Sequence, residues 1–133
     1  MKILYFSRDY CPHDYRFLKA IHDIGHEVFF LRLENSGRNL ESRELPEGVH
    51  EAEWRWREIP YDPRNADAIL SDLKEIFDQI QPDVIHSGPL TDVSWLTAEA
   101  DLHPYAAMSW GFDLMHDIEA DPRLKQNAAI ALH

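Results

Sequence analysis

The sequence predicts an α/β fold with a mainly parallel sheet between two layers of helices. Short, continuous apolar runs at residues 3–6 and 28–31 are typical of strands that are buried on both faces. A segment with helical periodicity separates them, and strand, helix and strand together occupy about thirty residues, the length of a βαβ unit. We therefore expect a Rossmann-like three-layer αβα domain with a sheet order of about 3-2-1-4-5.

The first half of the chain contains one helix, one loop and one further strand in this prediction. A helix begins near Asp14 and ends at Gly25, with an apolar stripe at i, i+3, i+4 and i+7 formed by Phe17, Ala20, Ile21 and Ile24. Residues 34–48 are polar and contain glycine and proline, which indicates a surface loop. The alternation of Trp and Arg over residues 54–57 predicts a strand near a sheet edge, with one face buried.

The second half alternates two strands with three helices. The predicted strands are residues 83–87 and 105–109. The predicted helices run from about 65 to 81, from 91 or 92 to about 103, and from 122 to the end of the chain. Asp121 caps the last helix and Pro122 opens it, with Leu124, Ala128 and Leu132 on one side. Because this helix returns toward the sheet without a following strand, we expect the domain to be truncated at its C-terminus.

Composition limits the partners and the location. The 133 residues suit one domain, and 24 acidic against 13 basic side chains give a net charge of −11. Such a charge repels nucleic acid and anionic lipid. We therefore expect no nucleic-acid partner, and the same repulsion argues against membrane contact. Cys11 is the only cysteine, and no apolar targeting segment is visible, so we expect a cytoplasmic location.

Several common catalytic motifs are absent. The chain has no G-x-G-x-x-G, Walker or HExxH motif and no paired cysteines, which argues against NAD or FAD enzymes, P-loop phosphoryl transfer and zinc chemistry. The eight histidines are scattered without metal-ligand spacing. We therefore assign no metal, no cofactor and no catalytic residue.

Three loops are positioned for ligand binding. In an open α/β sheet, ligands bind beyond the carboxyl ends of the strands, where the strand order reverses. The loops that follow the strands starting near residues 2, 83 and 105 are residues 7–13, 87–91 and 110–113. We expect them to lie next to one another.

The order of four short motifs resembles the family 4 glycosyltransferases. They are KILYFS at residues 2–7, GHEV at 25–28, PDVIH at 82–86 and SWGFD at 109–113. The resemblance covers nearly the whole chain, and the order and spacing of the motifs are more specific than any one of them.

This resemblance implies a GT-B enzyme, in which two Rossmann-like domains face a cleft. Residues 1–133 would be the N-terminal, acceptor-side domain, incomplete and without the C-terminal donor-binding domain that carries the family's E-x7-E element. Such enzymes transfer a sugar from a nucleotide-sugar to a sugar, glycolipid or small-molecule acceptor, with retention and without a metal. The missing domain would be the partner of this chain, which should be inactive alone.

Two departures from the family pattern alter the expected contacts. Many relatives carry a Gly-Gly pair where this chain has residues 13–16, so contact with the donor phosphate would use Arg8 or Arg16 instead. Many also have histidine at the position of Trp110, which here would offer an apolar face to a sugar ring. The candidate substrate-binding residues are Arg8, His13, Arg16, His86, Gly88, Pro89, Leu90, Trp110, Gly111 and Asp113.

Structural roles compete with binding at several of these positions. His86 suits a hydrogen bond to the neighbouring loop as well as a contact with the acceptor. Asp113 suits capping of the next turn, Gly88 and Gly111 suit tight turns, and His13 with Arg16 suits a solvated helix start.

A second class of function is also open. The chain would suit a complete flavodoxin-like binding or signalling module without catalysis, provided that it had its own closing strand. Receiver domains of that class place clustered acids after the first strand, whereas this chain has only Asp9 there. An incomplete sheet would also leave an edge that pairing of two copies would cover, so a homodimer is a further expectation.

Overall fold

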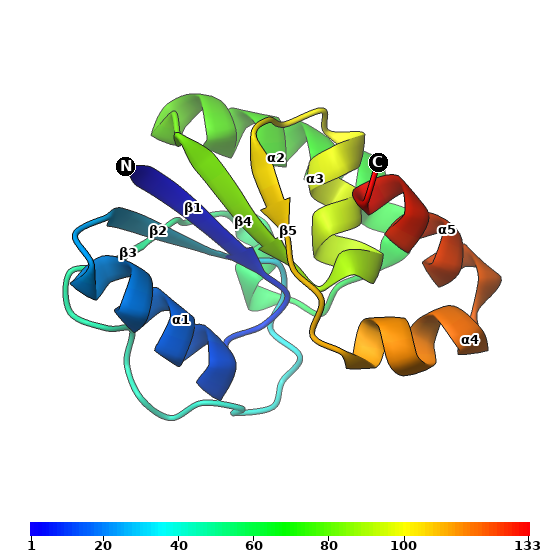
Figure 1. The fold of residues 1–133 in the computed structure, drawn as a ribbon, viewed down its shortest axis with the longest axis horizontal. Coiled ribbons are helices and arrows are strands. Elements are labelled where there is room, and N and C mark those ends of the chain that lie inside the picture. The colour runs from blue at the N-terminus through cyan, green and yellow to red at the C-terminus, as the bar shows by residue number, and fades with distance from the viewer.

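A five-stranded parallel sheet forms the middle layer of the chain, all of whose residues, 1–133, are described by a computed structural model (Figure 1). The strands lie in the order β3-β2-β1-β4-β5, and every neighbouring pair is parallel. Their bounds are β1 Lys2–Ser7, β2 Glu27–Arg32, β3 His50–Glu51, β4 Val84–Gly88 and β5 Tyr105–Ala107. The predicted fold class and strand order are confirmed.

Helices cover both faces of the sheet. Helix α1 (Pro12–Asp23) lies on one face, while α2 (Ala66–Ile80) and α3 (Trp95–Glu99) lie on the other (Figure 1). This division follows from right-handed crossovers, because β1 to β2 runs in one direction across the sheet and β3 to β4 to β5 runs in the other. Helices α4 (Ile118–Ala120) and α5 (Pro122–Ala131) follow β5. None of the helices has the length and apolar character needed to cross a bilayer.

The sheet separates two apolar clusters. Leu4 and Phe6 of β1 point toward α2 and α3, where they join the larger cluster with Leu73 and Leu96. Tyr5, which lies between them in sequence, points the other way and packs with Leu18 of α1 and with β2. This alternation along one strand is expected for a sheet that is buried on both faces.

Helix α1 presents a different face to the sheet from the predicted one. Leu18 is fully buried and Ile21 half-buried, whereas Phe17 and Ile24 are 39% and 73% exposed. The rotation of the helix suits Asp14, a buried residue whose carboxylate accepts hydrogen bonds from the Tyr5 hydroxyl at 3.1 Å and from the Cys11 backbone N–H at 2.7 Å. The predicted apolar stripe was therefore wrong, because a buried polar contact sets the orientation of this helix.

The strand predicted over residues 54–57 is also wrong. These residues lead into a 3-10 turn, Arg55–Glu58, and the third strand is the two-residue β3 instead. The indole N–H of Trp54 donates to the Arg32 carbonyl at 2.6 Å, and that of Trp56 donates to Asp72 of α2 at 2.7 Å. Each tryptophan thus satisfies its polar atom with a distant partner, which an extended strand at the sheet edge would not provide.

The C-terminal third differs from the prediction in its details. Strand β5 ends at Ala107 instead of residue 109, and the helix after β4 begins with a π-helical turn, Leu90–Ser94, before the short α3. Residues 113–120, to which the sequence assigned no helix, form a π-helical turn and α4. Helix α5 begins after Asp121 as predicted, and the Asp121 carboxylate accepts a hydrogen bond from the Arg123 N–H at 2.8 Å. Leu132, however, is exposed instead of buried.

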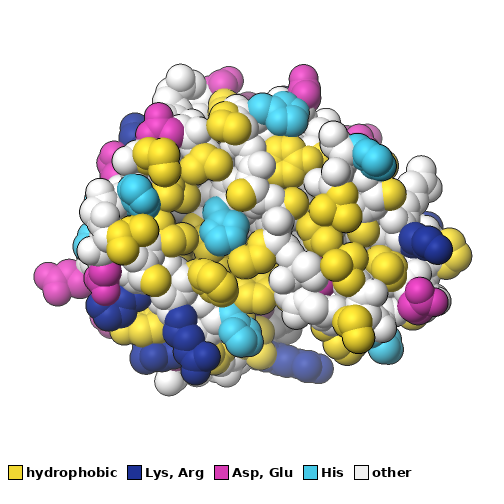
Figure 2. Space-filling model, viewed as in Figure 1, with side chains coloured by type: hydrophobic (Ala, Val, Ile, Leu, Met, Phe, Trp, Pro, Cys, Tyr) yellow, Lys and Arg dark blue, Asp and Glu magenta, His cyan; other side chains and the backbone are white.

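One part of the sheet lacks a covering helix. On the side of α1, no helix crosses β4 and β5, and β5 has a single neighbour in the sheet (Figure 1). The same view in Figure 2 shows apolar and histidine side chains over much of this face. The region beside α1 is therefore the more open side of the domain.

The orientation of α1 predicts an unequal response to two alanine substitutions. We expect Leu18→Ala to lower the free energy of unfolding by about 2–5 kcal/mol, because it leaves a cavity beneath the helix. Ile24→Ala should change it by less than about 0.5 kcal/mol, because Ile24 is largely in water. Urea denaturation followed by circular dichroism measures both. Equal losses, or a larger loss for Ile24→Ala, would contradict the observed packing.

Candidate functional site

A cleft of about 610 Å³ opens at the carboxyl ends of the strands. Its walls come from the loop between β1 and α1, from the segment after β2, and from the loops after β4 and β5. The three loops singled out from the sequence therefore meet at one place. Of the candidate residues, the cleft is lined by Arg8, His13, Pro89 and Trp110.

The other candidate residues lie outside this lining. Arg16 is exposed on α1, Gly88 and Leu90 are buried, and Gly111 is exposed at a turn with φ of 82°. A Cβ atom on Gly88 would lie 2.6 Å from the Met108 carbonyl oxygen, so this glycine allows the chain after β5 to approach β4.

His86 of β4 belongs to the sheet face on the side of α1 and not to the cleft. Its ring lies between those of Tyr5 and Phe17, with centroid distances of 5.0 and 6.0 Å. Burial lowers the pKa of His86 below its ordinary value. The ring therefore contributes apolar packing in its neutral form at neutral pH.

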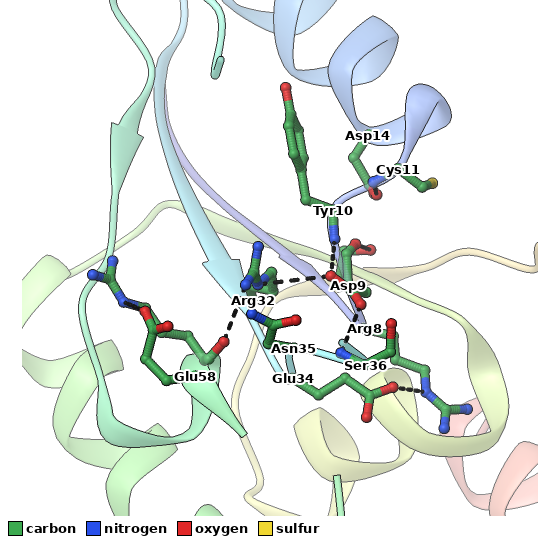
Figure 3. A network of polar contacts seen from close by, with 12 residues as sticks. Arg8, Asp9, Tyr10, Cys11, Asp14, Arg32, Glu34, Asn35, Ser36 and Glu58 are labelled. Carbon is green, nitrogen blue, oxygen red and sulfur yellow. Dashed lines mark hydrogen bonds and ion pairs between the residues drawn. The ribbon is translucent and has the colours of Figure 1, made fainter. Parts of the chain in front are cut away.

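Arg8 is held by two acidic residues at the floor of the cleft. Its Nε donates to Glu34 at 2.6 Å and its Nη1 pairs with Asp92 at 2.9 Å. Both carboxylates are buried, and Glu34 also accepts the Tyr61 backbone N–H at 2.6 Å. Figure 3 shows Arg8 and Glu34 side by side beyond the ends of the strands.

Glu34 and Asp92 are site residues that were not predicted from the sequence. A usable signal was present, because each acid follows a buried strand within a few residues and so lies near its carboxyl end. Their pairing with Arg8 was not predictable, since the partners are 26 and 84 residues away in the chain.

Burial and the ion pairs shift the pKa values of Arg8 and Asp92 in opposite directions. Burial raises the pKa of Asp92 to about 6, although the Arg8 guanidinium lowers it. Burial also lowers the pKa of Arg8, but Asp92 and Glu34 outweigh this effect and leave it above its ordinary value. At neutral pH Asp92 and Arg8 are therefore both charged, and the guanidinium is fixed in place by its two contacts.

A second set of hydrogen bonds joins the β1 loop to the segment after β2. Asp9 accepts the backbone N–H groups of Tyr10 at 2.7 Å and Ser36 at 3.0 Å, and its carboxylate lies 3.7 Å from Arg32 Nε (Figure 3). These contacts connect two cleft walls that belong to different strands. The β1 loop and the segment after β2 are therefore held in a defined position relative to each other.

Comparison with known protein families shows the family to which the chain belongs. The sequence model of a family described as glycosyl transferase 4-like matches residues 2–132. The chain belongs to this family. The resemblance drawn from the four motifs is thereby confirmed, and a comparison with curated proteins finds no match.

A solved structure supports the fold of this glycosyl transferase 4-like domain. The C-terminal domain of a hydrogenase from Pyrococcus furiosus superposes with a TM-score of 0.52 and 22% identity, over 77% of this chain and 91% of that domain. At this identity the likeness concerns the fold alone.

The cleft of this glycosyl transferase 4-like domain contains polar side chains that have no hydrogen-bond or ion-pair partner in the chain. The Arg38 side chain makes no ion pair or hydrogen bond with the rest of the chain, and neither does the side chain of His13. The Trp110 ring lies next to His13, with centroids 5.6 Å apart. The Arg38 guanidinium can therefore pair with an anionic group, and the Trp110 ring can pack against an apolar ring. The chain contains no group of three His, Cys, Asp or Glu side chains that could hold a metal ion.

The amino end of α1 forms another part of the wall. Cys11, His13 and Asp14 all line the cleft. Burial raises the pKa of Cys11 to about 11 and raises that of Asp14 above its ordinary value. Cys11 is therefore a neutral thiol at neutral pH. Because Pro12, the first residue of α1, has no backbone N–H, the N–H groups at the positive end of the helix dipole begin with that of His13.

Asp113 joins the loops after β4 and β5. Its carboxylate accepts the backbone N–H of Leu90 at 2.9 Å, the Ser109 hydroxyl at 2.6 Å and the backbone N–H of Leu114 at 3.0 Å. The residue is buried and does not line the cleft. In this structure Asp113 positions the loops that carry Pro89 and Trp110.

The burial of Asp92 predicts a pH-dependent effect of Asp92→Asn. Because the folded-state pKa of about 6 lies above the ordinary value of 3.8, the folded protein retains this proton longer than the unfolded chain. Asp92 therefore reduces stability as the pH rises through this window. We expect the free energy of unfolding of Asp92→Asn, relative to the wild type, to increase by about 2–3 kcal/mol from about pH 4 to about pH 7.

Urea denaturation at several pH values measures this difference. Glu75→Gln, at an exposed acid of α2 that makes no ion pair, is the control for the loss of one carboxylate from the chain. A constant difference between Asp92→Asn and the wild type across this range would contradict the burial argument.

Proposed function

We propose that this chain is the acceptor-side domain of a retaining GT-B glycosyltransferase, which transfers a sugar from a nucleotide-sugar to an acceptor. The observation that carries the proposal is the cleft at the strand ends, which is lined by the unpaired side chains of Arg38 and His13 and by Trp110, the ring next to His13. Membership of the glycosyl transferase 4-like family supports it. The partner domain in this proposal is a second Rossmann-like domain that binds the nucleotide and closes the cleft.

In this proposal, different cleft residues bind the diphosphate and the sugar ring of the donor. Arg38, His13 and the amino end of α1 face the donor diphosphate, on which negative charge grows as the bond to the sugar breaks. Trp110 packs against a sugar ring through its apolar face. Arg8 remains fixed by Glu34 and Asp92, and offers its free guanidinium edge toward the ligand.

The remaining candidate residues do not contact the ligand in this proposal. Asp113, Gly88 and Leu90 hold the loops after β4 and β5 in position, and His86 packs against Tyr5 and Phe17 on the side of the sheet that carries α1. Arg16 lies on the exposed side of α1 and makes no phosphate contact in this proposal. We place the reaction in the cytoplasm, where a free thiol such as Cys11 persists and where the proposed donor is made.

The roles of Arg38 and Arg16 are tested in the chain combined with its donor-binding domain. We expect Arg38→Ala to lower kcat/KM for the nucleotide-sugar by about 10- to 100-fold, because a charge-assisted contact with the diphosphate is lost. Arg16→Ala is the matched control and should leave kcat/KM within about twofold. Release of nucleoside diphosphate from a panel of nucleotide-sugars provides the assay, and NMR of the product reports whether the anomeric configuration is retained.

Two results would count against the proposal. Turnover of none of the nucleotide-sugars, together with binding of FMN, would favour the stand-alone flavodoxin-like module. Inversion of the anomeric configuration would exclude the retaining mechanism while leaving the transferase assignment in place.

A further inference from the structure

Arg8 lies between the cleft and a second space, the rear cavity. The rear cavity has a volume of about 600 Å³, and its walls include the π-helical turn after β4, α3 and α5 (Figure 1). Arg8 is the only residue that lines both spaces, whereas Glu34 lines only the cleft and Asp92 lines only the rear cavity. One acid therefore holds the guanidinium from the cleft, and the other holds it from behind.

Part of the Arg8 guanidinium remains available to a ligand. Its Nε donates to Glu34 at 2.6 Å (Figure 3), and its Nη1 pairs with Asp92 at 2.9 Å. Its Nη2 makes no hydrogen bond or ion pair within the chain. The Arg8 side chain is 48% exposed, whereas those of Glu34 and Asp92 are 8% and 7% exposed. An oxyanion in the cleft can therefore contact Arg8, while Asp92 acts on it only through the guanidinium.

The π-helical turn after β4 gives Asp92 a defined position. The backbone N–H of Leu90, at the start of this turn, donates to the Asp113 carboxylate at 2.9 Å. The amide of Asn127 in α5 donates to the Thr91 carbonyl at 3.0 Å. The turn is thus attached to two other segments, which hold the Asp92 carboxylate behind the cleft.

The charge of Asp92 offsets the charge that Arg8 presents to the cleft. An ionised carboxylate in contact with the guanidinium repels a second anion that approaches the same group, and this repulsion is strong where water is largely excluded. A protonated Asp92 removes the repulsion, and its carbonyl oxygen can still accept a hydrogen bond from Nη1. Burial raises the pKa of Asp92 to about 6, so the two forms interchange near this pH.

Other charged groups around Asp92 act on it without replacing it. After burial, Arg8 and the Val93 backbone N–H lower its pKa, and the carboxylates of Glu34 and Asp113 raise it. The other titratable or charged residues that line the rear cavity are Tyr61 ahead of α2, Glu99 of α3, Asp117 on the turn before α4 and Arg123 of α5. None of these four forms an ion pair with Arg8 or Asp92. Asp92 is therefore the acid of the rear cavity that acts directly on Arg8.

We propose that Asp92 is a positioning residue for ligand binding: it holds the Arg8 guanidinium from behind the cleft, and its protonation state sets how strongly Arg8 binds an oxyanion there. Protonation of Asp92 strengthens binding of the anion, and by linkage a bound anion favours protonation of Asp92. That the oxyanion is the donor diphosphate rests on the proposed function, whereas the control of anion binding does not.

Sulfate is a suitable probe, because its charge stays constant from about pH 5 to about pH 8, a range that spans the pKa of Asp92. His13 also lines the cleft and is titratable, so the parent protein carries His13→Asn. Sulfate is titrated at constant ionic strength, and the indole ¹⁵N–H signal of Trp110 reports binding in the cleft. We expect the affinity of the parent for sulfate to fall by about fivefold or more across this range, because ionised Asp92 offsets the charge on Arg8.

Three substitutions in this parent separate the effect of Asp92 from other effects of pH. Asp92→Asn keeps a carbonyl oxygen for Nη1 but removes the charge, so the affinity for sulfate should vary by less than about twofold across the range. Arg8→Gln should weaken binding and remove the dependence on Asp92. Glu99→Gln, at an exposed acid of the same cavity that makes no ion pair, is the matched control and should retain the fall in affinity.

A second measurement needs no substitution of Asp92. The ¹³C signal of its carboxyl group follows its protonation, and saturating sulfate should move the midpoint of this titration to higher pH. This measurement decides the question also where Asp92→Asn fails to fold.

The outcomes separate this inference from the proposed function. If sulfate does not bind in the cleft, if Asp92→Asn leaves the pH profile unchanged, or if sulfate leaves the Asp92 midpoint unchanged, the inference is overturned, whether or not the chain combined with its donor-binding domain transfers a sugar. If Asp92→Asn removes the profile but no nucleotide-sugar is turned over, the control of anion binding stands and the donor diphosphate is overturned as its ligand.

Discussion

The ion pairs of Arg8 with Glu34 and Asp92 are the contacts on which the organisation of this domain depends. They join the ends of β1 and β2 to the turn that follows β4, three segments that are far apart in the sequence. Buried carboxylates lose their hydration, so each needs a cation or several hydrogen-bond donors to remain charged. A buried pair of this kind contributes little net stability but restricts the arrangement of the chain around it. Here it fixes the floor of the cleft.

Two further buried acids apply the same principle to the surrounding loops. Asp14 determines which face of α1 meets the sheet, and Asp113 joins the loops that carry Pro89 and Trp110. Each carboxylate accepts at least two hydrogen bonds, so its burial is compensated locally. The side chains that line the cleft are thus carried by loops whose positions are set by buried polar contacts. This separation of supporting acids from cleft-lining side chains is the main feature of the site.

The distribution of charge gives the cleft two different cations. The chain carries a net charge of −11, yet the Arg38 side chain in the cleft has no acidic partner. Arg8, in contrast, is paired with both Glu34 and Asp92. The cleft therefore combines a guanidinium that is fixed by buried acids with one that is unpaired.

The sequence by itself determined the fold class, the strand order, the family and the place where the loops meet. These depend on local signals, namely apolar runs, helical periods, capping residues and short motifs, and they brought Arg8, His13 and Trp110 to one cleft. Only the tertiary structure decided the rotation of α1, the 3-10 turn in place of a strand at Arg55–Glu58, and the pairing of Arg8 with its two acids. Each of these depends on hydrogen bonds or ion pairs between residues whose proximity arises from folding. A periodic pattern records that a side chain is apolar or polar, but not which distant partner satisfies it.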